Sequence, residues 1–223
     1  MRKFLFAPFL MVLLFAACTH EAYESGDSKY SYLRSDFVEA TTNAAATFVM
    51  AETDDGEKIV LAPPLKTKWA TSPDSIYRAL LYYNRFSDRK EFISLIQIPV
   101  LKVQQTNDNA TTIDPVGFTS AWLAKNKRYI NLELALKTGE VKAEKQPLQS
   151  LGAAVIAQKV MENGATKYEI QLLHKQKGVP EYYTTRTFVS IPTTLFHAND
   201  SIEVIVKTYN GTIKKGFRLW SLF

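Results

Sequence analysis

The sequence predicts an all-β protein of two domains, a small five-stranded OB-like barrel followed by an antiparallel β-sandwich. Short runs of β-branched and aromatic residues recur along the chain, separated by clusters of glycine, asparagine, aspartate and proline. No stretch repeats a convincing helical period over three turns. The length of 223 residues and the hydrophobic content of 46% give enough material for two globular domains.

Residues 1–17 are typical of a bacterial lipoprotein signal peptide. Two positive charges precede an apolar run that is too short to cross a membrane, which takes about 20 residues. Two alanines stand directly before Cys18, the only cysteine, as in a lipobox, although Phe15 occupies a position where leucine is usual. We therefore expect cleavage before Cys18 and a lipid on its thiol. The alternative is an ordinary secretory signal beside an incidental cysteine.

The polar segment 18–31 is expected to be a flexible tether between the lipid and the folded chain. The expected partner of the N-terminus is thus a membrane, and the expected location is the cell envelope, at the outer membrane. Removing the signal takes away two basic residues and lowers the net charge from +5 to +3. The high isoelectric point therefore does not argue for a nucleic-acid partner.

The barrel domain is placed at residues 32–105. Asp54-Asp55-Gly56-Glu57 predicts a hairpin, because Asp-Gly suits residues with positive φ. Pro63-Pro64 is expected to end the third strand, because proline has no N–H to donate to the sheet. Five strands in about 70 residues are typical of an OB-like barrel. The expected strands are 36–42, 47–53, 58–62, 77–86 and 92–103.

A polar linker at 106–115 is expected to separate the barrel from the sandwich at 116–223. Turns are predicted at Asn163-Gly164 and Asn210-Gly211. The segment 150–162 fits a helix or a strand, and the turn residues that bracket it favour the strand. Seven strands are expected in the sandwich, at 116–123, 129–137, 153–161, 167–174, 184–191, 201–209 and 212–220.

The C-terminal domain contains a distinctive succession of segments. They are Asp114-Pro115-Val116 with Trp122, Tyr129-Ile130-Asn131-Leu132, Tyr168-Glu169-Ile170-Gln171-Leu172-Leu173-His174, Phe188-Val189-Ser190-Ile191-Pro192 and Ile202-Glu203-Val204-Ile205-Val206-Lys207-Thr208-Tyr209. Together with the lipoprotein signal and the barrel, they resemble the NigD-like lipoproteins of Bacteroidetes over nearly the whole chain. The resemblance implies a cell-envelope protein associated by name with bacteriocin-related operons, without an activity or catalytic residues. Thr19-His20-Glu21 replaces the usual acidic run after the lipid cysteine. The sequence therefore does not decide between the periplasmic and the outer face of the outer membrane.

No catalytic residue is expected, and the chain is interpreted as a non-enzyme. His174 and His197 are the histidines of the folded region, and each is expected to bond backbone groups at a strand end or in a turn. The sequence contains no Gly-x-Ser-x-Gly elbow. The acidic cluster at 52–57 lacks the spacing of a calcium loop. No metal and no cofactor are therefore expected.

Aromatic and basic residues gather between Trp69 and Phe86. OB-like barrels often bind polymers through aromatic and basic side chains on one face. Tyr83 and Arg85 share one face of their strand, so Trp69, Tyr83 and Arg85 are the candidate contacts for a glycan or a peptide. One face of that strand must also form the barrel core. Nucleic acid is not expected, because the barrel is acidic overall and lies outside the cytoplasm.

Two tripeptides, Asp74-Ser75-Ile76 and Asp200-Ser201-Ile202, resemble the acceptor motif for O-glycosylation in Bacteroidetes. Ser75 and Ser201 are therefore candidate modification sites. The whole sequence predicts a non-enzymatic lipoprotein that acts as an interaction or accessory module, with an envelope protein or a glycan as its partner. The alternative is an extracellular glycan- or peptide-binding lipoprotein, and a hydrolase is a distant third.

Overall fold

The described part of the chain consists of β-strands joined by turns and loops. The computed structural model describes residues 33–84, 91–105, 113–140 and 147–220. These ranges contain 13 strands in three sheets and no helix, which confirms the all-β fold class with a barrel and a sandwich. Within the same ranges, no helix is long and apolar enough to span a membrane. The signal peptide, the tether and most of the linker at 106–115 lie outside the described residues.

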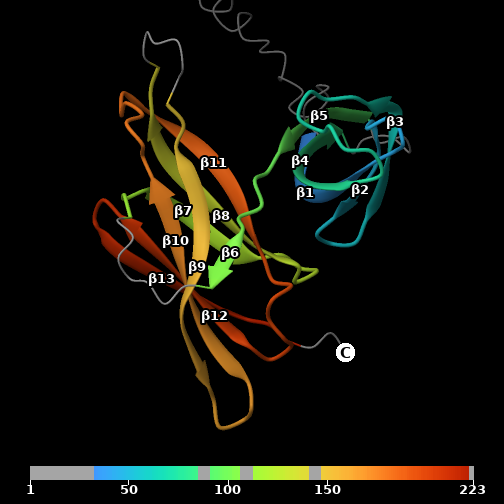
Figure 1. The fold of residues 1–223 in the computed structure, drawn as a ribbon. Coiled ribbons are helices and arrows are strands. Elements are labelled where there is room, and N and C mark those ends of the chain that lie inside the picture. The colour runs from blue at the N-terminus through green and yellow to red at the C-terminus, as the bar shows by residue number, and fades with distance from the viewer. Residues whose placement is uncertain (1–32, 85–90, 106–112, 141–146, 221–223) are drawn as a thin grey trace, which may run out of the picture.

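The first domain is a curved sheet of five antiparallel strands in the order β3-β2-β1-β4-β5 (Figure 1). β3 and β5 approach each other, so the sheet curls into an OB-like barrel. Alternate side chains of every strand fill its interior, among them Val38, Phe48, Leu61, Leu81 and Leu95. The strands are β1 (Leu33–Thr42), β2 (Phe48–Thr53), β3 (Lys58–Leu65), β4 (Ile76–Asn84) and β5 (Glu91–Gln97).

The second domain is a sandwich of a five-stranded sheet, β13-β12-β10-β9-β6, and a three-stranded sheet, β11-β8-β7. Its core is aliphatic and includes Leu132, Leu134, Ile170, Ile191 and Val204. The strands are β6 (Val103–Gln105), β7 (Gly117–Leu123), β8 (Tyr129–Thr138), β9 (Ser150–Val160), β10 (Thr166–Lys175), β11 (Tyr183–Pro192), β12 (Ser201–Thr208) and β13 (Gly211–Arg218). β9 confirms the strand interpretation of the ambiguous segment.

The sandwich is mixed rather than purely antiparallel. β10 pairs with β12 in parallel, and β6 pairs with β9 in parallel. β11 lies in the opposite sheet, so the chain crosses between the sheets before β12 returns beside β10. The predicted hairpins are confirmed, since Gly164 and Gly211 have φ values of +80° and +119°, which glycine adopts without strain.

Two strand boundaries of the barrel differ from expectation. β3 continues through Pro63-Pro64 to Leu65, which pairs with Phe48. The prolines are tolerated because β3 is the edge strand of its sheet. On its outer side no described neighbouring strand requires a backbone N–H donor. β5 ends at Gln97, and the chain then leaves the barrel to form β6 in the sandwich. The barrel therefore ends before residue 105, the boundary expected from the sequence.

The two domains meet at a polar seam centred on Arg78 of β4. The Arg78 side chain has no exposed surface, and two of its nitrogens donate to the two oxygens of Asp54, each at 2.6 Å. From the sandwich, Asn131 Oδ1 accepts a bond from Arg78 at 3.1 Å and Ser190 Oγ accepts one at 3.4 Å. A buried charge is tolerated only with such a set of partners. The seam also explains why the outer face of β4 is buried at Arg78.

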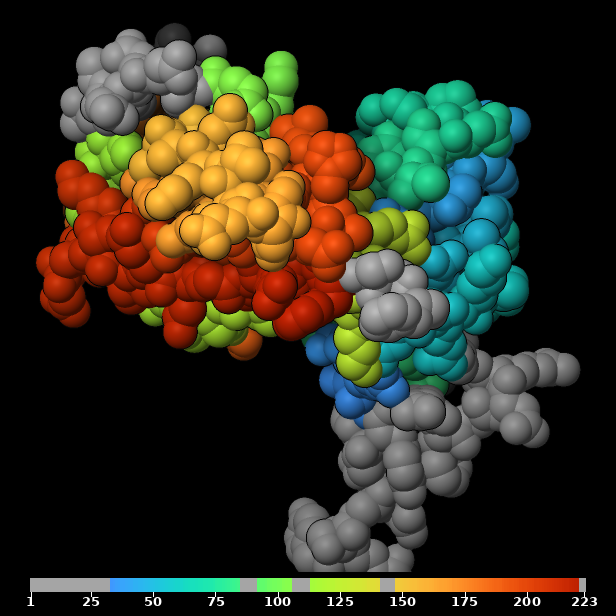
Figure 2. Space-filling view, turned by 90° about the horizontal axis from the view of Figure 1, so that it is seen from below, coloured from blue at the N-terminus to red at the C-terminus, as the bar shows by residue number. Residues whose placement is uncertain are grey.

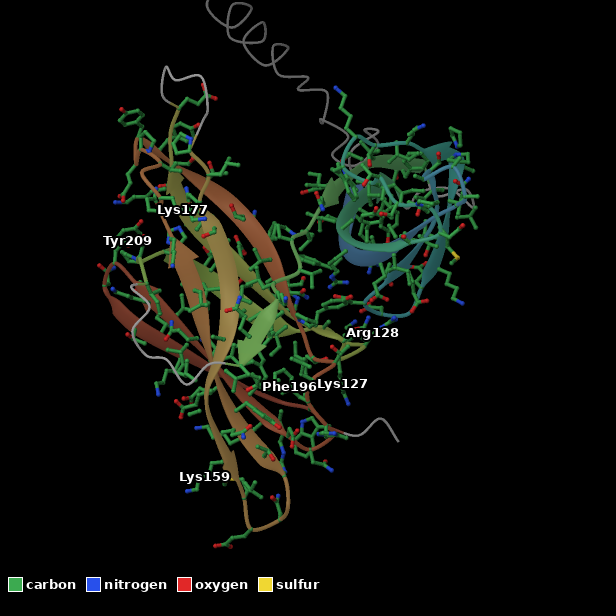
Figure 3. The ribbon with its side chains drawn as sticks, in the orientation of Figure 1. Lys127, Arg128, Lys159, Lys177, Phe196 and Tyr209 are labelled. Atoms are coloured by element: carbon green, nitrogen blue, oxygen red, sulfur yellow. The ribbon has the colours of Figure 1, made fainter. Side chains whose placement is uncertain are left out.

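Aromatic and charged contacts surround Arg78. Phe37 of the barrel makes edge-to-face contacts with Trp122 and Phe188 of the sandwich, with ring centroids 5.3 and 5.4 Å apart. Arg128, which precedes β8 and is labelled in Figure 3, forms an ion pair with Glu39 of β1. Figure 2 shows the yellow-green part of the chain lying against the blue and cyan barrel. The two domains thus form one body.

Candidate binding cleft

Of the three predicted ligand contacts, the two that lie in the described part of the chain, Trp69 and Tyr83, do not form a groove. Tyr83 is fully buried in the barrel core, and its hydroxyl donates to Asp36 Oδ2 at 2.6 Å. Burial and this bond hold the pKa of Tyr83 well above its usual range. Trp69 packs against Phe48 with ring centroids 5.0 Å apart, at the border of the same core. Tyr83 as a ligand contact is wrong, because its face of β4 forms the core, and Arg85 lies outside the described residues.

The two candidate modification sites lie at the starts of strands. Ser75 Oγ, just before β4, donates to the Pro73 carbonyl at 2.7 Å. Ser201 begins β12, and Asp200 before it is buried. The Asp200 carboxylate accepts bonds from two backbone amides, each at 2.8 Å, which gives this residue a structural role. Glycosylation of either serine stays a prediction.

The two histidines have different surroundings. His174 is buried on β10, where Nε2 donates to Gln149 Oε1 at 2.9 Å and Nδ1 lies 3.3 Å from the Asp114 carbonyl oxygen. The side chain of His197 is 88% exposed, and its Nδ1 lies 3.7 Å from Asp200 Oδ2, beyond hydrogen-bond distance. Across the described ranges, no three residues of the types that commonly bind metals come together.

A cleft of about 530 Å³ opens at one end of the sandwich. This volume is within the range of about 300–1,000 Å³ that is usual for small-ligand sites. A second hollow, of about 670 Å³, lies beside the β9–β10 hairpin and includes Ser201, but much of it is the exposed hairpin tip. The first cleft is lined by Leu136, Thr138, Gly139, Glu140, Pro147, Leu148, Gln149, Val179, Tyr183, Thr185 and Thr187.

The cleft forms where the inner face of β11 changes from aliphatic to polar. Ile191 and Val189 have no exposed surface and belong to the sandwich core. The next residues on the same face are Thr187, Thr185 and Tyr183, and Tyr183 is 53% exposed. Threonine and tyrosine combine apolar surface with a hydroxyl group, so they can line a wet cleft. The inner face of β11 is therefore polar where it lines the cleft.

A hydrogen-bond network fixes the polar side of the cleft. Gln149 Nε2 donates to the Lys137 carbonyl at 2.6 Å, and its Oε1 accepts the bond from His174. Gln176 Nε2 donates to the same Lys137 carbonyl at 3.0 Å and to the Val179 carbonyl at 2.9 Å. These hydrogen bonds within the chain hold the two side-chain amides in place, so the polar side of the cleft is preformed.

Exposed apolar and aromatic side chains lie near the cleft, at the end of β8 that contributes to its lining. Leu148 and Tyr182 are each 75% exposed. Tyr209, labelled in Figure 3, has its ring centroid 4.3 Å from Lys137 Nζ. Lys137 also pairs with Glu181 at 3.0 Å, and this contact raises the pKa of Lys137. This end of the sandwich therefore combines apolar area with paired charges, as binding surfaces commonly do.

The sequence matches no family model and no curated protein. A NigD-like immunity protein from Bacteroides caccae matches 83% of this chain and 96% of its own, with a TM-score of 0.64 at 20% identity. The chain has a NigD-like fold. A candidate toxin-related protein from Parabacteroides distasonis matches 85% of this chain and 94% of its own, with a TM-score of 0.61 at 15% identity. A candidate lipoprotein from Bacteroides fragilis matches 83% and 96%, with a TM-score of 0.55 at 14% identity.

The NigD-like resemblance is thus confirmed for the fold, while the cleft was missed by the sequence analysis. A signal for it exists in the sequence of β11. Its C-terminal half has aliphatic residues at Val189 and Ile191, as a core strand requires. Its N-terminal half, Tyr183–Thr187, has no aliphatic residue on either face. The half of β11 without aliphatic residues is the half that lines the cleft.

Proposed function

We propose that this chain is a non-enzymatic lipoprotein of the cell envelope that acts as an interaction or accessory module. It is anchored at the outer membrane through a lipid on Cys18. The observation that carries the proposal is the NigD-like fold, shared over 83% of the chain with an immunity protein and with a candidate lipoprotein. An accessory role of this kind needs a surface that binds rather than residues that react.

The seam between the domains supports a binding role. Arg78 has partners in both domains, and the aromatic contacts of Phe37 cross the same boundary. A partner therefore meets a surface whose two halves are already fixed relative to each other. Binding to a preformed surface avoids the entropy cost of ordering it.

The cleft favours a second candidate function, the binding of an extracellular glycan or peptide. It combines an aromatic ring at Tyr183 with the hydroxyl groups of Thr185 and Thr187. Rings stack on sugars or side chains, and hydroxyls satisfy the polar groups of either ligand. An array of polysaccharides and peptides probed with the full chain distinguishes this function from an accessory role that uses flat surfaces.

Membrane fractionation and mild protease treatment of intact cells test the envelope assignment. We expect the wild type and a Thr19→Ala control in the membrane fraction and the Cys18→Ala variant in the soluble fraction, because one residue carries the lipid. Cleavage of the wild type in intact cells would indicate the outer surface, and protection would indicate the periplasmic face. A Cys18→Ala variant that stays bound as firmly as the wild type would refute the lipid anchor.

A further inference from the structure

Within the described part of the chain, one edge of the smaller sandwich sheet is unpaired over half of its length. β11 pairs with β8 on one side and is the last strand of its sheet on the other. On the outer side, Ser190 donates its N–H to the Pro99 carbonyl at 2.9 Å and accepts a bond from the Leu101 N–H at 2.8 Å. No described strand lies on that side of Tyr183–Thr187. The connection between the domains thus covers only the second half of the edge.

The regular pairing of β11 shows which backbone groups face outward. In an antiparallel ladder, the N–H and C=O groups of successive residues point alternately to the two sides. β11 pairs with β8 without a register shift, so residues four and six positions before an outward-facing Ser190 also face outward. Thr184 and Arg186 are therefore open to pairing. The side chains from Tyr183 to Arg186 are exposed, as expected for an uncovered edge.

The open edge runs along the cleft. Tyr183, Thr185 and Thr187 line the cleft with side chains from the inner face of β11. A strand added beside β11 would place every second side chain on that same face, and therefore in the cleft. The lining contains one carboxylate, on Glu140, and is otherwise made of apolar side chains such as Leu136 and Val179 and of uncharged polar groups, so most of it suits uncharged side chains.

We propose that the open edge of β11, Tyr183–Thr187, binds an extended segment of another protein by strand addition, with alternate uncharged side chains of that segment in the cleft. This inference rests on the proposed function as an interaction module and names its partner as a peptide rather than a glycan. The chain itself already uses this edge in the same way, because Val100 forms a parallel bridge with Ser190. Main-chain bonds give affinity in this mode, and the cleft gives specificity.

A second copy of the chain fits this edge less well than a single segment. Figure 1 shows the barrel on the side of the sandwich where the connection meets β11, which is the side to which the open edge points. Pairing β11 with the β11 of another copy would bring a whole sheet to that side, where the barrel stands. A single extended segment needs only the width of one strand, about 4.8 Å.

The test uses the full chain, purified in detergent, and a phage-displayed library of random peptides long enough to form a strand. The most enriched peptide is synthesised, and its Kd is measured for the wild type and three variants. Thr184→Pro removes an outward N–H, Thr185→Trp fills the cleft without changing the backbone, and Thr184→Ala is the matched control. We expect the control to bind within about twofold of the wild type and the other two at least tenfold more weakly. Thermal unfolding confirms that each variant is folded.

Three results would overturn the proposal. They are a library that enriches no peptide, an enriched peptide that binds Thr184→Pro as tightly as the wild type, and a wild-type dimer that Thr184→Pro makes monomeric. Each result leaves the envelope assignment standing if fractionation still shows the lipid anchor. Conversely, if the native chain is found to carry no lipid but still binds the peptide at β11, only the lipid anchor is refuted.

Discussion

At the scale of single residues, Arg78 lies at the centre of the polar contacts between the domains. Its guanidinium group lies 4.3 Å from the ring centroid of Tyr129, in addition to its bonds to Asp54, Asn131 and Ser190. Arginine suits this place because its planar fork gives two bonds to one carboxylate and still leaves donors for other partners. The charge is buried with its partners in place, so removing one partner leaves the others unsatisfied.

We predict that Arg78→Met lowers the free energy of unfolding by about 3–5 kcal/mol, because it leaves the largely buried Asp54 carboxylate unpaired. Arg218→Met is the matched control, since the Arg218 side chain is exposed and forms no ion pair among the described residues, and it is expected to change stability by less than about 0.5 kcal/mol. Urea unfolding followed by circular dichroism measures both. Equal stabilities of the two variants would show that the seam contributes little.

Residues also explain why the predicted ligand contacts were misplaced. Alternation along β4 correctly separates its two faces, with Tyr83 on one and Tyr82 on the other. Alternation alone does not say which face is the core, because aromatic residues occur on both. The outer face also contains Arg78, which is buried only because the sandwich covers it. That burial depends on a contact between distant segments and has no local signal.

At the scale of elements, close packing of β7 on β8 depends on a glycine. A Cβ atom at Gly117 would lie 2.7 Å from Ala135 Cβ and 2.8 Å from the Ala135 carbonyl oxygen. The latter is a backbone atom, so the strands would have to move apart. Gly216 on β13 has nothing within 4 Å of the same position, and neither glycine has a positive φ. The two residues therefore form a matched pair.

We predict that Gly117→Ala destabilises the protein by about 1–3 kcal/mol through this overpacking. Gly216→Ala is expected to be neutral within about 0.5 kcal/mol. Thermal unfolding of both variants measures the difference. If Gly117→Ala unfolds at the wild-type temperature, the spacing between β7 and β8 is wider than the structure gives.

Elements also show how far sequence patterns predict this fold. The seven strands and two Asn-Gly turns expected in the sandwich are all present, because alternation and turn chemistry are local signals. The parallel pairs β10–β12 and β6–β9 were not expected. Which distant strands become neighbours depends on how whole sheets cover each other, and alternation within one strand carries no such information. The open edge of β11 could not be predicted for the same reason.

At the scale of the whole molecule, the seam is also sensitive to alkaline pH. The Tyr129 hydroxyl donates to Glu39 Oε1 at 2.8 Å across the boundary between the domains. Burial and this bond raise the pKa of Tyr129 to about 12. An unfolded tyrosine loses its proton near pH 10, so the folded state holds the proton more tightly. The contribution of Tyr129 is thus complete below about pH 10 and is lost as the pH rises toward about 12.

We predict that the urea midpoint of the wild type falls between about pH 9.5 and 11.5, and that Tyr129→Phe makes this fall shallower. Tyr182→Phe is the control, because the Tyr182 side chain is largely exposed. Tryptophan fluorescence, to which Trp122 in the seam contributes, follows the transition. A pH profile of Tyr129→Phe identical to that of the wild type would show that the Tyr129 hydroxyl does not couple the domains to pH.

The bonds of Arg78 also bear on how this gene can change over time. Arg78 and Asp54 belong to the barrel, while Asn131 and Ser190 belong to the sandwich. A recombination event that exchanged only one domain would bring together halves whose buried polar groups no longer match. We therefore expect the two domains to be inherited as a unit, with substitutions at these four positions arising together rather than one at a time.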